Sequence, residues 1–147
     1  MDAFNKGARS APQNNRPEAN RCWSIEEFHG WSKVSIKDRI DSFNQTAFQE
    51  DLSNLLQTSP RSVAIEVSQV RFLSLKAIHL LNDIAGLVLQ AGLRVALVAP
   101  SEKLKRQIDI YAELERWEIF RSLNDLAENH PDTPAYRDRG DGPFANL

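Results

Sequence analysis

The side chains in this sequence that could do chemistry are few and widely spaced. His29, His79 and His130 lie far apart along the chain, and Cys22 is the single cysteine. A structural metal site needs several cysteine or histidine ligands at close spacing, so this pattern does not support one. The sequence also lacks the G-x-S-x-G motif of a hydrolase nucleophile and the phosphate-binding P-loop. We therefore expect no catalytic residue, no metal and no cofactor.

A small group of basic residues lies in the third helix that the sequence predicts. Lys103, Lys105 and Arg106 fall within four positions of one another. These side chains either form a solvated helix face or contact an anionic group, such as a nucleotide phosphate or an acidic protein. Both interpretations stay open at the level of sequence.

Length and charge narrow the class of protein further. The chain has 147 residues, of which 41% are hydrophobic, and this is enough for one domain with a core. Its formal net charge of −2 argues against a protein that mainly coats nucleic acid. No stretch reaches the roughly 20 apolar residues of a membrane-spanning helix, so we expect no membrane insertion. The lack of an apolar signal sequence, together with the single cysteine, indicates a cytoplasmic protein.

Both ends of the chain have a composition typical of flexible segments. Residues 1–21 are rich in Asn, Pro, Arg, Ala and Gly, and residues 128–147 contain three prolines and two glycines. Such segments bury too little apolar surface to fold on their own. We predict a disordered N-terminal arm at 1–21, one folded domain at 22–127 and a flexible tail at 128–147.

Between these ends, hydrophobic spacing alternates between the strand period and the helix period. Strands are predicted at residues 23–28, 31–37, 62–68 and 94–98, and residues 117–120 form either a last short strand or a turn. Helices are predicted at residues 43–57, at 75–90 and after Ser101, where Leu104, Ile108 and Tyr111 share a face. Ser42 with Gln45, and Ser122 with Asp125, have the spacing of a helix capping box.

The order of these elements, β-β-α-β-α-β-α, limits the fold. Strands separated by helices pair in parallel through right-handed crossovers. The short turn at His29 and Gly30 makes the first two strands an antiparallel hairpin. The sequence thus predicts an α/β domain with a mixed, mostly parallel sheet of four to five strands packed against helices.

Over roughly residues 22–126 the sequence resembles the STAS family (sulfate transporter and anti-sigma factor antagonist). The segment SIKDRIDSFNQTAFQEDL (35–52) is similar to a family strand, its G-x-[IL]-D turn and first helix, with Asp38 at the usual glycine. SVAIEVSQVRFL (62–73) is similar to the next strand, with Glu66 at the usual aspartate. GLRVALVAPSEKLKRQID and ELERWEIFRSLNDL resemble the two later segments. The resemblance implies a STAS-type fold.

The sequence departs from the family at the start of the second main helix. Anti-sigma factor antagonists carry D-S-[ST]-G there, and a kinase partner phosphorylates a hydroxyl in this motif. Here Ser74 stands at the aspartate, Leu75 at the usual acceptor and Ala77 at the glycine. Because Leu75 has no hydroxyl, we predict that the usual phosphorylation does not switch this domain. Ser74 is either a helix N-cap or a displaced phospho-acceptor, and Lys76 is either solvated or an anchor for an acidic partner.

The resemblance implies a non-catalytic protein–protein interaction module that acts in signalling or transcription regulation by partner switching. The partner would be an anti-sigma or kinase-like protein, another STAS protein, or a second copy in a homodimer. The implied partner-binding surface comprises Asp41, Asn44, Ser74, Leu75 and Lys76. Two alternatives stay open: an accessory STAS subunit of a lipid-transport ATPase complex, and a nucleotide-binding STAS domain.

Overall fold

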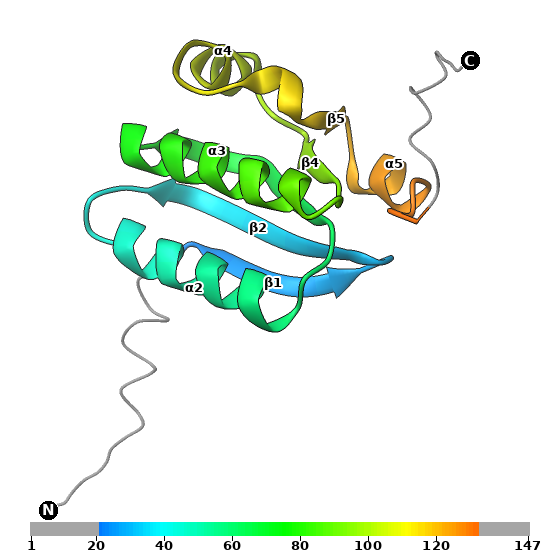
Figure 1. Cartoon of the computed structure of the whole chain (residues 1–147). Helices are drawn as coiled ribbons and strands as arrows, with labels where there is room; N and C mark the ends of the chain where they lie inside the picture. Colours follow the sequence, from blue (N-terminus) through cyan, green and yellow to red (C-terminus); the bar gives the residue numbers. More distant parts are fainter. Residues whose placement is uncertain (1–20, 133–147) are drawn as a thin grey trace, which may run out of the picture.

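A five-stranded sheet with the strand order β1-β2-β3-β4-β5 forms the centre of the fold (Figure 1). The strands of this computed structural model are β1 (Trp23–Phe28), β2 (Trp31–Ile40), β3 (Val63–Leu73), β4 (Val95–Val98) and β5 (Glu118–Phe120). β1 is antiparallel to β2, and all other neighbours are parallel, so the predicted mixed sheet is confirmed. The structure describes residues 21–132. Residues 1–20 of the arm predicted at 1–21, and residues 133–147 of the tail predicted at 128–147, lie outside them.

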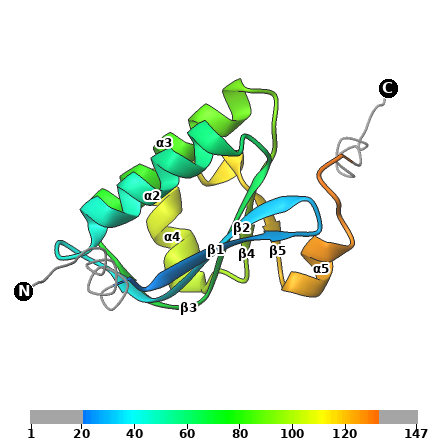
Figure 2. The same cartoon turned by 90° about the horizontal axis from the view of Figure 1, so that it is seen from below.

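Three helices lie in one layer over one face of the sheet, as Figure 2 shows. They are α2 (Gln45–Thr58), α3 (Leu75–Gln90) and α4 (Glu102–Tyr111). Alternate strand residues, among them Val34, Ile65 and Leu97, point into this layer and form the main core with Phe48 and Leu81. Burial of these apolar side chains is the main force that holds helices and sheet together.

The opposite face of the sheet is covered at one end. Trp31, Ala64, Ala96 and Val98 form a second, smaller core there with Leu126 of the short helix α5 (Leu123–Ala127). A 3-10 turn, η2 (Leu114–Arg116), joins α4 to β5. Figure 2 shows α5 at the far end of the sheet, away from the starts of α2 and α3.

β2 and β3 extend further than the sequence predicts, to Ile40 and Leu73 instead of residues 37 and 68. The two strands pair with each other over this extension, and register shifts near residues 35–39 interrupt the regular alternation of side chains. An interrupted alternation hides a strand from a period-two pattern. Asp38 within the extension has φ 62°, a left-handed conformation that favours glycine, which explains the glycine that the family usually carries there.

Serine side chains cap three of the four α-helices in residues 21–132. Ser74, Ser101 and Ser122 each accept a hydrogen bond from the backbone N–H three residues later, so the predicted caps at Ser74 and Ser122 are confirmed. The predicted capping box at Ser42 is wrong, because α2 begins after Asn44 and has no side-chain cap. Leu104 and Ile108 of α4 are buried, whereas Tyr111 ends this helix and is 51% exposed.

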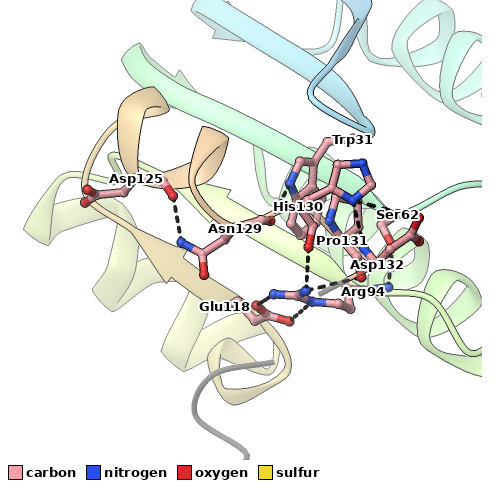
Figure 3. A network of polar contacts seen from close by, with 9 residues as sticks. All are labelled: Trp31, Ser62, Arg94, Glu118, Asp125, Asn129, His130, Pro131 and Asp132. Carbon is pink, nitrogen blue, oxygen red and sulfur yellow. Dashed lines mark hydrogen bonds and ion pairs between the residues drawn. The ribbon is translucent and has the colours of Figure 1, made fainter. Parts of the chain in front are cut away.

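A polar network closes the end of the sheet where the parallel strands begin (Figure 3). The Arg94 guanidinium donates two hydrogen bonds to the Glu118 carboxylate, at 2.9 and 2.6 Å, and lies 5.3 Å from the centre of the Trp31 ring. It also donates to the backbone carbonyls of His130 and Pro131, both at 3.3 Å, and the Trp31 indole N–H donates to Asn129 O at 3.0 Å. Residues 129–131 are thus attached to β2, β4 and β5.

Arg94→Gln should destabilise the domain, because it leaves the largely buried Glu118 carboxylate without its bidentate partner. We expect a loss of about 2 kcal/mol in the free energy of unfolding, measured by urea denaturation. Arg121 is an exposed arginine that follows β5, and Arg121→Gln should change the free energy of unfolding by less than about 0.5 kcal/mol. Equal stability of the two variants would contradict this role of Arg94.

Ser74→Ala should cost more than Ser101→Ala, although each removes one helix cap. The Ser101 cap is worth about 1 kcal/mol, whereas the Ser74 hydroxyl also donates to Gln45 Oε1 of α2 at 2.8 Å. We expect a loss of about 2 kcal/mol at Ser74 in the same denaturation experiment. A smaller loss at Ser74 than at Ser101 would show that its bond to α2 contributes nothing.

Candidate functional site

Ser74 joins three elements at the edge of the sheet where β2, β3 and β4 end. Its backbone N–H donates to Ile40 O at the end of β2, at 2.9 Å. Its hydroxyl accepts from Ala77 N in the first turn of α3, at 3.0 Å, and donates to Gln45 at the start of α2. These bonds place residues 41–44 beside the N-terminus of α3.

The loop of residues 41–44 is shaped by its own side chains. Asn44 Oδ1 accepts from Asp41 N at 2.8 Å, while Asn44 Nδ2 donates to Arg39 O at 3.2 Å. Asp41 Oδ1 accepts from Phe43 N at 2.9 Å. Asn44 is only 6% exposed, so it holds the loop in shape, whereas Phe43 is 93% exposed.

The structure brings the five predicted residues to this edge and adds Phe43 to them. It buries Asn44, so the prediction that this residue belongs to the exposed surface is wrong. Leu75 is 49% exposed and Lys76 is exposed, both in the first turn of α3. We call Asp41, Phe43, Ser74, Leu75 and Lys76 the α3 edge. Sequence reasoning missed Phe43 because it placed this residue inside a helix. A signal was nevertheless present, since Phe43 is out of step with the i, i+4 stripe of buried residues in α2.

The start of α3 is the positive part of this edge, while Asp41 on the adjacent loop is negative. The first turn of α3 contains no acidic residue, and its free N–H groups carry the positive end of the helix dipole. Lys76 adds a cation that makes no ion pair with any residue in the described range 21–132. A carboxylate brought by a partner would therefore be favoured here.

A shallow polar groove of about 520 Å³ continues from Lys76 along the exposed side of α3. Its lining includes Gln49 of α2, His79 and Asp83 of α3, and Tyr111 of α4. Within residues 21–132, no three His, Cys, Asp or Glu side chains are grouped so that they could hold a metal ion. In the same range, no helix is both long and apolar enough to cross a membrane.

Comparison with solved structures shows the same fold in several proteins. An anti-sigma factor antagonist from Mycobacterium paratuberculosis has a TM-score of 0.65 at 21% identity, covering 75% of this chain and 93% of that one. Bacillus SpoIIAA in its phosphorylated form has a TM-score of 0.61 at 12% identity, covering 72% and 96%. The murine anion transporter Slc26a9 has a TM-score of 0.52 at 18% identity, covering 70% of this chain and 18% of that one.

No curated protein matches the chain in sequence. A family model does match: the STAS domain model aligns with residues 23–126, which is most of the chain. This range contains every strand and helix described above except the last residue of α5, and it includes the three elements that meet at Ser74. The chain therefore belongs to the STAS domain family.

Proposed function

We propose that this chain is a non-catalytic interaction module that binds its partner protein through the α3 edge. Half-exposed Leu75 at the start of α3 carries this proposal, with Phe43 on the adjacent loop. Single exposed apolar residues are common on protein surfaces, but neighbouring ones beside polar groups are typical of an interface. On binding, both side chains would lose contact with water, which favours association.

The partner would be a kinase-like anti-sigma protein or another STAS protein in the cytoplasm, and the module would act by partner switching. This rests on the family and on the fold shared with SpoIIAA and with the anti-sigma factor antagonist from Mycobacterium paratuberculosis. The positive N-terminus of α3 with Lys76 suits a partner that presents an acidic group.

The usual phosphorylation would not control this module. Leu75 stands at the acceptor position and offers no hydroxyl. The hydroxyl of Ser74 is engaged both as a donor to Gln45 and as an acceptor from Ala77 N. A phosphate on Ser74 would have to replace the bond to α2, so the N-cap role supports our view against a displaced acceptor.

A second candidate function is an accessory role in a transport complex. The similarity to part of the Slc26a9 anion transporter favours it, because this fold also occurs as one segment of a much longer transporter chain. The two candidates differ in the partner that the protein binds, so one capture experiment separates them.

Leu75→Glu should abolish partner capture and leave the fold intact, because it places a charge on an exposed apolar contact. The experiment is affinity capture from a lysate of the source cells, with partners identified by mass spectrometry. Leu87→Glu is the matched control: this leucine is 54% exposed and lies near the other end of α3. Thermal unfolding followed by circular dichroism should be unchanged in both variants.

A kinase-like or STAS-containing partner that is lost with Leu75→Glu and kept with Leu87→Glu would support the proposed function. Loss of the partner in both variants, or in neither, would contradict a role for the α3 edge. Recovery of a membrane ATPase with the wild-type protein would favour the transport role instead.

Leu75→Ser should create a phosphorylation site where the wild-type chain has none, because it restores a hydroxyl at the usual acceptor position. The captured kinase, incubated with radiolabelled ATP, should label this variant and leave the wild-type chain unlabelled. Ser74→Ala in the same assay tests whether the neighbouring Ser74 hydroxyl accepts phosphate. Labelling of the wild-type chain that disappears with Ser74→Ala would show that Ser74 is a displaced acceptor after all.

A further inference from the structure

The extension of β2 and β3 forms a two-stranded parallel ribbon. Residues 37–40 of β2 pair with residues 69–73 of β3, whereas β1 reaches only Ile36 and β4 reaches only Glu66 in the register. Parallel strands are normally covered on both faces. On this ribbon Ile40 and Leu73 are buried in the core, but Arg39 and Phe72 are exposed.

Three cations and one aromatic ring gather on and beside the ribbon. Arg39 and Phe72 are opposite each other in the register, so their side chains share a face. Arg71, Phe72 and Lys103 line one small depression between β3 and the start of α4. We call Arg39, Arg71, Phe72 and Lys103 the ribbon surface.

The ribbon surface has an excess of positive charge. The carboxylate of Asp38 lies beside it, 3.5 Å from Arg39 Nε and 4.0 Å from Arg71 Nε. Two guanidinium groups thus share a single carboxylate, and their side chains stay 51% and 80% exposed. Glu102 does not offset Lys103, because it forms an ion pair with Lys105 at 2.8 Å.

This local charge is opposite in sign to the net charge of the whole chain, −2. The net charge of the protein therefore does not attract an acidic molecule. Attraction of such a molecule must come from the local charge of the ribbon surface. Exposed arginines around an aromatic side chain are also the composition that protein interfaces favour. Phe72, at 48% exposure, offers an apolar contact between the cations.

We propose that the ribbon surface binds an acidic segment of the partner protein. Carboxylates of that segment pair with Arg39, Arg71 and Lys103, and the arginines can hold them through two parallel hydrogen bonds. An apolar side chain of the same segment packs on Phe72. This inference rests on the proposed function and names the chemistry of the partner.

The charge pattern favours an acidic peptide over a nucleic acid. A nucleic acid presents regularly spaced phosphates and needs a basic stripe that is free of carboxylates. Asp38 lies between the two arginines of the ribbon, and Glu102 lies beside Lys103. A peptide can place its carboxylates between these acidic groups.

The test measures binding of a fluorescein-labelled peptide of about twelve residues, rich in Asp, Glu and Leu, to the full chain by fluorescence anisotropy. The double variant Arg39→Gln with Arg71→Gln should weaken binding by about tenfold or more. The matched control, Arg61→Gln with Arg121→Gln, removes one arginine that precedes β3 and one that follows β5, and should change affinity by less than about twofold. Equal affinity of the two double variants would overturn the proposal.

Asp38→Asn is a second variant, and we expect it to change the peptide affinity in the opposite direction. It removes the carboxylate that competes for both arginines, and asparagine tolerates the left-handed backbone at this position. Peptide binding should therefore tighten about threefold, and it should weaken when salt rises from about 50 to about 300 mM. Weaker binding with Asp38→Asn, or tighter binding of a single-stranded oligonucleotide than of the peptide, would overturn the proposal.

Partner capture separates this inference from the proposed function. Loss of the cellular partner from both Leu75→Glu and the Arg39/Arg71 double variant would support both. A partner that is lost with Leu75→Glu but kept by the double variant would overturn the acidic-segment proposal and leave the proposed function standing. A partner that is lost from the double variant alone would support the ribbon surface and contradict the α3 edge.

Discussion

The hydrogen bonds of Ser74 are the constraint on which the shape of the α3 edge depends. One residue joins the end of β2 to the starts of α2 and α3, through its N–H to Ile40 O and its hydroxyl to Gln45 and Ala77 N. These contacts set the position of Leu75 and of the loop that carries Phe43. A serine thus takes the place of the aspartate that the family usually has, and the cap of α3 is retained although the phospho-acceptor is not.

The two ends of the sheet differ in burial and in the kind of side chains that they carry. At the end where the parallel strands begin, Arg94 joins Glu118, Trp31 and the segment after α5 in a largely buried network, which stabilises the fold. At the other end, exposed apolar and basic side chains stand on short loops, helix starts and the β2–β3 ribbon. Binding residues generally lie on loops that a rigid scaffold positions, and this separation leaves accessible groups on such a scaffold.

Pattern and spacing predict much of this fold but less of its surface. The short apolar run of β4 and the apolar helix α3 are readable from the sequence, and the order of the elements predicts a mixed, mostly parallel sheet. Register shifts near the extended ends of β2 and β3 interrupt the alternation of apolar and polar residues. The sequence pattern therefore does not predict the ribbon that carries Arg39 and Phe72. The start of α2 is missed because Asn44 bonds to Asp41 N and Arg39 O, contacts that depend on the folded loop and not on capping-box spacing.

Hydrogen–deuterium exchange of the full chain, alone and with its captured partner, tests the central claim most directly. Binding through the α3 edge predicts slower exchange of backbone amides in residues 41–44 and 74–77, with little change around Trp31, Arg94 and Asn129. Protection confined to the Arg94 end of the sheet, with no change at residues 74–77, would contradict the claim that this domain binds its partner through the start of α3.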